Sequence, residues 1–262
     1  MELILQGFPI FLLIFCRITS FFVVAPIFSS NGVPNTLKIG LSFFISLLIY
    51  LTYGVNQTIT EDMTYVLLII SEVMVGLLLG FVGYLLITVV QIAGSFIDIQ
   101  IGFGMANVLD PLTGASVPLI GNFKYMIAML LFLSMDGHLQ LIDAIFHSYE
   151  WVPISNDYFM KLYNGSISEF LVRTFSQSFV LAFQMSAPLV VALFLTDVGL
   201  GFLAKTAPQF NIFVIGIPVK IFLGLAMLVL IVPSFSYVFS NLFTILFESL
   251  HNLLGVVGND PN

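Results

Sequence analysis

The chain has 262 residues, of which 59% are hydrophobic and 8% are charged, and its mean hydropathy is +1.10. An ordinary soluble domain contains about a quarter charged residues, so this composition excludes a soluble globular protein. The formal net charge of −7 argues against nucleic acid as a partner, because nucleic acids attract basic patches. We therefore expect a protein whose main surroundings are the lipid bilayer.

Several apolar windows approach or exceed the roughly 20 residues that a helix needs to cross a bilayer. The polar–apolar alternation of a membrane barrel is absent, and only helices then satisfy the backbone inside lipid. We predict an all-α polytopic membrane protein with broken and hairpin helices. The windows are Phe8 to Phe28, Ile39 to Tyr53, Met63 to Ile97, Val117 to Met135, Phe175 to Thr196 and Ile212 to Phe247.

The first window is expected to remain in the protein. The residues before it include the acidic Glu2 but no basic residue, and no Ala-x-Ala type site follows it. The segment therefore does not resemble a cleaved signal peptide. Cys16 is the only cysteine, which excludes an internal disulfide. The helix orientations are not predicted, because only seven Lys and Arg residues are present, and Arg17, Lys124 and Lys220 lie inside apolar segments.

Two windows are too long for a simple crossing. Met63 to Ile97 would form a helix of about 52 Å, against about 30 Å of hydrocarbon. It forms either a hairpin of short helices, or one helix of which much stands outside the bilayer and is covered by other protein. Ile212 to Phe247 poses the same problem, with Pro218 and Pro233 as predicted breaks. Both windows point to an assembly of several chains.

Glu72 is a carboxylate inside an apolar run. With Gly76, Gly80 and Gly83 it falls on one narrow helical face, where glycines let another backbone approach closely. This spacing predicts tight helix packing around a paired Glu72. The alternatives are that glycine is simply frequent in membrane helices, or that Glu72 is a proton or ion site.

The stretch GSFIDIQIGFGMANVLDP, Gly94 to Pro111, interrupts the apolar sequence with glycine, proline and polar residues, which predicts a loop. Its apolar members Phe103, Met105 and Val108 would suit a plug in a conduit that closes by hydrophobic contact. Spacing alone favours a buried connector instead.

No catalytic or metal-binding motif is present, so we expect neither enzyme activity nor a cofactor or metal. Asp143 and His147 are four residues apart and are expected to touch as a polar pair rather than to bind a metal. An aspartyl dyad of Asp98 and Asp110 lacks the surroundings that an intramembrane protease would need.

The stretch AKTAPQFNIFVIGIPVK, Ala204 to Lys220, places prolines and lysines between two apolar segments. From Ala207 onward it resembles the carboxy-terminal signature of the FliR family of flagellar export apparatus proteins, called SctT in injectisome type III secretion. Lys205 departs from the arginine common in the family but keeps the charge. The resemblance covers nearly the whole chain in order, through RITSFFVVAPIFSSNGVPNTLKIGL (Arg17 to Leu41), the Glu72, Gly76 and Gly80 helix, the Gly94 to Pro111 stretch and DGHLQLIDAIFHS (Asp136 to Ser148).

The resemblance implies a subunit of the export gate in the bacterial cytoplasmic membrane and the flagellar basal body. FliP and FliQ would be its partners in a helical conduit for unfolded flagellar export substrates, with FlhB associated and FlhA nearby. A FliP-like part at about 1–200 would be followed by a FliQ-like hairpin at about 201–262, within a single FliR-type membrane domain at 1–262.

The resemblance also assigns roles to residues. The loop that obstructs the closed channel would lie at Gly102, Phe103, Gly104, Met105, Val108 and Asp110. Helix packing and assembly would involve Arg17, Glu72, Gly76, Gly80, Gly83, Lys205, Pro208, Gln209, Pro218 and Lys220. Pro208 and Pro218 would bound a turn and a short helix, while Lys205 and Lys220 would find carboxylates or carbonyls on neighbouring subunits, because an unpaired buried ammonium is costly.

Three other functions stay open at this point. An injectisome export gate subunit would share every motif. A secondary transporter would also have broken helices, but it should show paired internal repeats, and no convincing repeat is present. An intramembrane enzyme would need a catalytic set, which was not found.

Overall fold

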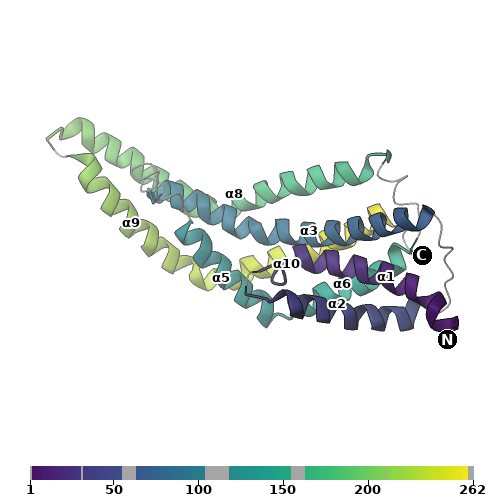
Figure 1. The fold of residues 1–262 in the computed structure, drawn as a ribbon. Helices are drawn as coiled ribbons and strands as arrows, with labels where there is room; N and C mark the ends of the chain where they lie inside the picture. The colour runs from purple at the N-terminus through teal and green to yellow at the C-terminus, as the bar shows by residue number, and fades with distance from the viewer. Residues whose placement is uncertain are drawn as a thin grey trace, which may run out of the picture. The chain divides into compact units, whose positions relative to one another are not determined.

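The computed structural model describes residues 2–30, 32–54, 63–103, 118–154, 163–209 and 211–258 (Figure 1). These ranges are helical and contain no β-strand, so the all-α prediction is confirmed. In chain order the helices are α1 (Glu2–Val24), α2 (Asn35–Ile49), the π-helix η1 (Tyr50–Gly54), α3 (Met63–Ile101), α5 (Leu119–Ser134), α6 (Gly137–Trp151), α8 (Ser166–Thr206), α9 (Ile212–Ile231), the 3₁₀ helix η2 (Val232–Ser234) and α10 (Phe235–Val257).

Five segments are long and apolar enough to cross a membrane, and α5 with α6, bent by 67° at their junction, would make a sixth. The protein is therefore a multi-pass membrane protein. The bend lies at Asp136, a non-glycine residue with a φ of 57°. The five segments are Gly7–Val24, Asn35–Gly54, Thr64–Ile101, Ser166–Thr206 and Val214–Val257.

The chain forms two compact units, and the longest helices contribute to both. The first unit comprises Met1–Leu86, Phe132–Phe175 and Thr244–Asn262. The second comprises Ile87–Leu131 and Ser176–Phe243. Each is described by itself below.

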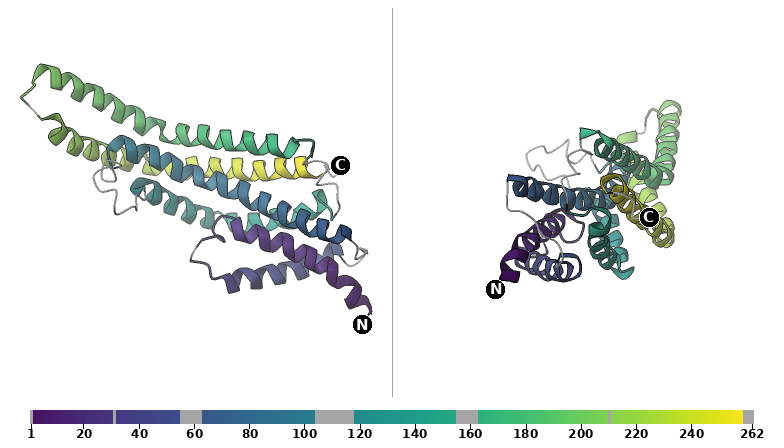
Figure 2. Two further views of the ribbon diagram at one scale, coloured as in Figure 1. Left: turned by 45° about the horizontal axis from the view of Figure 1, so that its top comes forward. Right: turned by 90° about the vertical axis from the view of Figure 1, so that its right-hand side faces the viewer.

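In the first unit, α1 and α2 lie side by side (Figure 2). Ile14, Ile18, Phe21 and Phe22 of α1 are fully buried. They recur every three or four residues, the period that places side chains on one face of a helix. The end of α10 repeats this pattern with Leu246, Leu250, Leu253, Leu254 and Val257, all of which are buried.

In the second unit, α8 and α9 form an antiparallel hairpin that turns between Thr206 and Ile212. A core of six buried residues joins this hairpin to α3 and α5, and it consists of Ile97, Ile101, Ile120, Leu189, Leu193 and Leu228. The antiparallel order follows from three contacts, between Leu200 and Gly216, between Asp197 and Lys220, and between Leu193 and Gly224.

Helix α3 corrects two predictions. It is one unbroken helix of 39 residues, about 58 Å long, so the hairpin alternative is wrong and the long-helix alternative holds. The loop predicted from Gly94 begins only after Ile101, because the helix continues through Gly94 and Asp98. Both residues serve packing: a Cβ on Gly94 would overlap with Gly121 of α5, and Asp98 bonds to the start of α5.

The prolines of the last long window behave differently from each other. Pro233 lies in η2, where the predicted break occurs. Pro218 lies within α9, which continues for three more turns, so the predicted short helix ending at Pro218 is wrong. Proline is tolerated inside membrane helices where local adjustments satisfy the carbonyl that it leaves unbonded. Pro208 lies in the turn between α8 and α9, as expected.

Candidate functional site

Arg17 of α1 and Glu72 of α3 form a buried ion pair in the first unit. The Arg17 Nε donates to Glu72 Oε2 at 2.6 Å, and Nη2 donates to Oε1 at 2.8 Å. Both residues are at least 99% buried, with exposed fractions of 0% and 1%. This two-point geometry is the one in which a guanidinium and a carboxylate bind most strongly.

The remaining Arg17 donors reach the carboxyl end of α6. Nη1 donates to the carbonyl and the hydroxyl of Ser148, both at 3.2 Å, and Nη2 donates to the carbonyl of Val152 at 2.9 Å. The guanidinium also lies 4.0 Å from the centre of the Tyr149 ring. Arg17 thus makes five hydrogen bonds, as many as it has N–H groups, and its charge lies at the negative end of the α6 dipole.

The glycine face that begins at Glu72 packs against α1 of the same chain. A Cβ on Gly76 would overlap with the Arg17 carbonyl and the Ser20 hydroxyl, and one on Gly80 would lie 2.9 Å from the Phe21 carbonyl. A Cβ on Gly83 would lie 3.2 Å from Pro26. Residue numbers increase together along the two helices, so α1 and α3 run parallel here. The close approach predicted from the spacing occurs within the chain.

Asp98 binds both ends of the segment that joins α3 to α5. Its backbone carbonyl accepts bonds from the N–H groups of Gly102 at 3.2 Å and Phe103 at 3.0 Å, which close α3. Its carboxylate accepts from the N–H groups of Ile120 at 3.0 Å and Gly121 at 3.2 Å, in the first turn of α5. A carboxylate from another helix therefore caps α5 and lies at the positive end of its dipole.

Two of the predicted loop residues are described. Gly102 has a φ of 103°, which favours glycine, and it ends α3 in a Schellman-type turn. Phe103 is half-buried and packs against the core of the second unit. The other predicted members lie outside the described residues, and these are Gly104, Met105, Val108 and Asp110.

Lys220 of α9 has a carboxylate partner in its own chain. Its Nζ lies 2.9 Å from Oδ1 and 3.0 Å from Oδ2 of Asp197 on α8, and the Gln100 amide of α3 donates to the same carboxylate at 2.9 Å. The hairpin brings Asp197 beside Lys220, so one carboxylate partner of Lys220 belongs to the same chain. The expected contact of Lys220 with a neighbouring subunit stays a prediction. The pair remains partly open, with the Asp197 side chain 41% exposed.

The other residues of the predicted assembly surface lie in the last turn of α8, in the α8–α9 turn or on α9. Lys205, Pro208, Gln209 and Pro218 are all exposed. Lys205 has no ion-pair partner among the described parts of the chain. These four side chains are thus free to contact another molecule, and their assembly role stays a prediction.

Lys124 of α5 is buried without a carboxylate. Its exposed fraction is 3%, and it has no ion pair or hydrogen bond with any residue that the structure describes. Its nearest aromatic neighbour is Phe235, whose ring centre lies 5.6 Å from Nζ. A lysine at the centre of a bilayer costs about 2.5 to 3.5 kcal/mol, so this arrangement calls for an explanation.

The polar pair predicted on α6 is part of a larger exposed cluster. His147 Nε2 lies 3.5 Å from Asp143, and its Nδ1 lies 3.1 Å from Glu150. Tyr53 of η1 donates to Glu150 at 2.6 Å. The contact of Asp143 with His147 is confirmed, and the described residues contain no group of three or more metal-binding side chains.

Sequence reasoning missed the partners rather than the charged residues themselves. Asp98 and Gln100 were predicted only as polar residues of a loop, and Asp98 also as half of a disfavoured catalytic dyad, whereas the structure shows that Asp98 caps α5 and Gln100 bonds to Asp197. Asp197 was not singled out. The rule that charges inside membrane helices are usually paired indicates that Arg17 and Glu72 each need a partner, but it does not say which residue that partner is.

The sequence matches the profile of one protein family over residues 8–246, which is most of the chain. That family is described as bacterial export proteins, family 1. The chain belongs to this family.

The chain is similar to flagellar proteins and to a Yop translocation protein. The flagellar biosynthetic protein FliR of Bacillus subtilis is 42% identical over 258 residues, which cover 98% of this chain and 99% of that protein. FliR of Pectobacterium carotovorum is 31% identical over 92% of this chain and 90% of its own length. The Yop proteins translocation protein T of Yersinia pestis is 30% identical over 84% of each chain.

Proposed function

We propose that this chain is a subunit of the core export gate of the flagellar type III protein export apparatus. In this role it forms a helical conduit with FliP and FliQ, through which unfolded flagellar proteins cross the bacterial cytoplasmic membrane at the basal body. FlhB associates with the gate, and FlhA lies nearby. The observation that carries the proposal is the 42% identity to a flagellar biosynthetic protein over nearly the full length of both chains.

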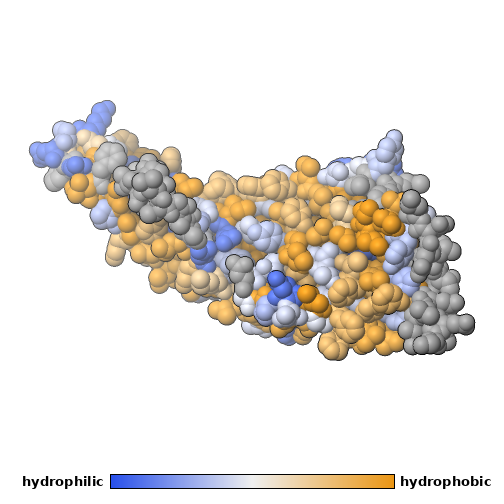
Figure 3. All heavy atoms as spheres, viewed as in Figure 1, coloured by the Kyte–Doolittle hydropathy of each residue, from blue (hydrophilic) through white to orange (hydrophobic). Residues whose placement is uncertain are grey.

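The length and exposure of the helices support an assembled state. Helix α8 has 41 residues and is about 61 Å long, twice the thickness of the hydrocarbon layer. In an apolar stretch of 18 residues within α8, only 22% of the residues are buried within the chain, and in one within Val214–Val257 only 17% are buried. Hydrophobic side chains cover most of the visible face in Figure 3. Because lipid covers only about 30 Å of such a helix, other subunits are needed to cover the rest.

The proposed division of the chain has a FliP-like part at about 1–200 and a FliQ-like hairpin at about 201–262. The proposed boundary falls near the carboxyl end of α8, before the turn that contains Pro208. A chain that contains both parts would complete a ring of FliP and FliQ subunits.

The proposed plug is the segment from Gly102 to Asp110. Its amino-terminal end is held by the turn at Gly102, and the start of α5 is held by the Asp98 carboxylate. The described residues on both sides of this segment are thus held by hydrogen bonds, which suits a closure that acts by hydrophobic contact.

Purification tests the assembly. The tagged chain is extracted in mild detergent from cells that express the flagellar genes, and its companions are identified by mass spectrometry. The proposal predicts that FliP and FliQ co-purify with the chain. Recovery of the chain alone or as a homo-oligomer would instead support a transporter.

Ion leakage tests the plug. A deletion within Phe103 to Val108 should make the closed gate leaky to small ions, measured as loss of membrane potential in cells. The matched control is a deletion of equal length in 55–62, a connection between η1 and α3 in the other unit. Unchanged leakage in a fully assembled deletion variant would contradict the plug role.

An injectisome subunit is the second candidate, and the 30% identity to Yop proteins translocation protein T supports it. Deletion of the gene in its host separates the two functions. Loss of flagella and swimming supports the flagellar assignment, and loss of effector secretion with normal swimming supports the injectisome.

A further inference from the structure

Three of the cations that lie inside apolar helices are at least largely buried, and only two of them are satisfied by residues that the structure describes. Arg17 makes five hydrogen bonds, and Lys220 is paired with Asp197. Lys124 has only the distant ring of Phe235, which attracts a cation but does not neutralise it. Among the described residues, no acid approaches its ammonium group.

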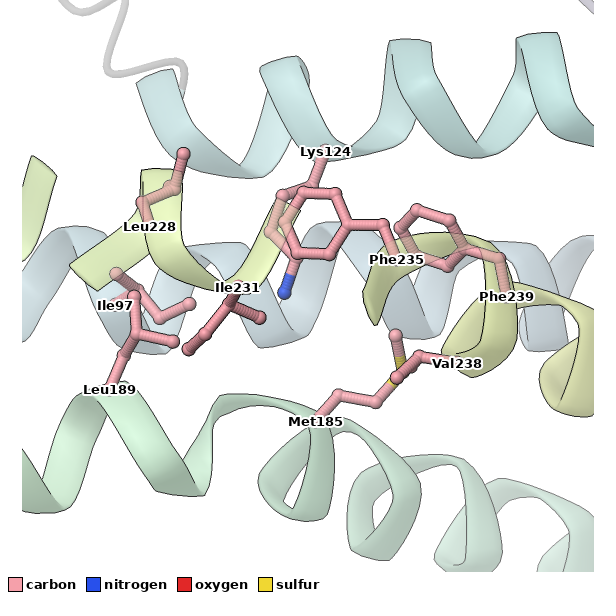
Figure 4. A pocket seen from close by; sticks show the side chains of 9 residues that line it. All are labelled: Ile97, Lys124, Met185, Leu189, Leu228, Ile231, Phe235, Val238 and Phe239. Atoms are coloured by element: carbon pink, nitrogen blue, oxygen red, sulfur yellow. The ribbon is translucent and has the colours of Figure 1, made fainter. Parts of the chain in front are cut away.

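The Lys124 side chain lines a cavity of about 30 Å³ within the second unit. Figure 4 shows the ammonium nitrogen extending from α5 past the ring of Phe235, with Ile231 beside it. The other lining residues carry no charge, and they are Ile97, Met185, Leu189, Leu228, Ile231, Phe235, Val238 and Phe239. A side chain that is 97% hidden thus holds a positive charge in an apolar hollow.

We propose that this cavity receives the carboxylate of an aspartate or glutamate side chain from another subunit of the export complex. The inference rests on the proposed function, because it needs a second subunit. One carboxylate neutralises one ammonium group, and buried charges in proteins are usually paired in this way. The cavity has about the volume of a single small group, whereas a lipid phosphate brings two acyl chains and usually meets several basic residues.

The helices that line the cavity also carry exposed apolar side chains that a partner subunit would cover. Val229, Leu230 and Tyr237 of α9 and α10 have exposed fractions of 67%, 77% and 80%. Pairing of an acidic residue of that subunit with Lys124 would make the contact specific for the correct partner.

Carbodiimide coupling of the wild-type complex tests the proposal directly. Dicyclohexylcarbodiimide enters apolar sites, activates a carboxylate and is lost as the urea when a touching amine forms the amide. We expect a cross-linked peptide that joins Lys124 to an Asp or Glu of another subunit, identified by mass spectrometry and absent from Lys124→Arg. A link to an acid of the same chain, or no link in an intact complex, would overturn the proposal.

Substitutions provide a second measurement. Lys124→Glu should reduce co-purification of the partner subunits by roughly ten-fold or more, the loss produced by disrupting a buried interfacial charge pair. The matched control is Arg173→Glu, an exposed cation of α8, which should co-purify as wild type does. Lys124→Met removes the charge without repulsion, and wild-type recovery of the partners by this folded variant would also overturn the proposal.

The proposed function and the proposed pairing of Lys124 predict different failures. If the wild-type chain recovers no FliP or FliQ, the proposed function fails. If it recovers them and Lys124 couples only within its own chain, the function stands and the inference alone fails.

Discussion

Arg17 and Glu72 are 55 positions apart in the sequence, and they bind each other through two hydrogen bonds of 2.6 and 2.8 Å. Both side chains are buried from solvent. Because Arg17 also holds Ser148 and Val152, one side chain joins α1, α3 and the end of α6. Breaking such a contact leaves a buried charge without its partner, which costs far more than the pair contributes when intact.

Removal of one charge should therefore destabilise the first unit strongly. We expect Arg17→Met to lower the free energy of unfolding by about 3 to 5 kcal/mol, because Glu72 stays buried and unpaired. The measurement is thermal unfolding in detergent, with exposed Arg173→Met as the control. The double variant Arg17→Met with Glu72→Met should recover part of the loss. A single variant with wild-type unfolding temperature would contradict the role of the pair.

The close approach of α1 and α3 should not tolerate a side chain at Gly76. Gly76→Ala places a methyl group against the Arg17 carbonyl and the Ser20 hydroxyl, and overpacking of this kind costs about 1 to 3 kcal/mol. Gly199→Ala is the matched control, because nothing lies within 4 Å of the position where its Cβ would be. Equal unfolding temperatures for the two variants would show that the helices can separate without cost.

Asp98→Ala should loosen the start of α5. Loss of a cap costs about 0.5 to 2 kcal/mol, and the amides that lose their acceptor belong to Ile120 and Gly121. Hydrogen exchange followed by mass spectrometry should show faster exchange in the peptide that contains them. Ser95→Ala is the control, since among the described residues its hydroxyl bonds only to the Gln91 carbonyl of the same helix. Unchanged exchange at α5 would contradict the capping role.

Charge reversal at Lys220 should be repaired by reversal at Asp197. Lys220→Glu places two carboxylates in contact, and we expect it to reduce the yield of the assembled complex before it affects transport. The penalty within the chain is about 1 kcal/mol, because the pair is partly exposed. The double variant Lys220→Glu with Asp197→Lys should restore the yield. Intact Lys220→Glu complexes that fail only in export would refute this order of effects.

The sequence by itself determined that the protein lies in a lipid bilayer, that it is helical, and how long its main apolar helices are. Hydropathy and helix length are local properties, so the windows around α1, α3, α5, α8 and α9–α10 could be read from runs of adjacent residues. The glycine face from Glu72 was also local, since helical periodicity alone places those residues together.

Only the tertiary structure decided which groups meet. The acceptors of Arg17 lie at positions 72, 148 and 152, and no local pattern indicates that three distant segments converge on one guanidinium. The same holds for Asp98. The sequence predicts it as a loop residue, whereas in the structure it lies in α3 and its carboxylate binds the first turn of α5. A proline or polar residue in an apolar run predicts a helix break, because a buried polar group without a partner is costly on average. Tertiary packing can supply the specific partner that removes this cost, as Asp197 does for Lys220.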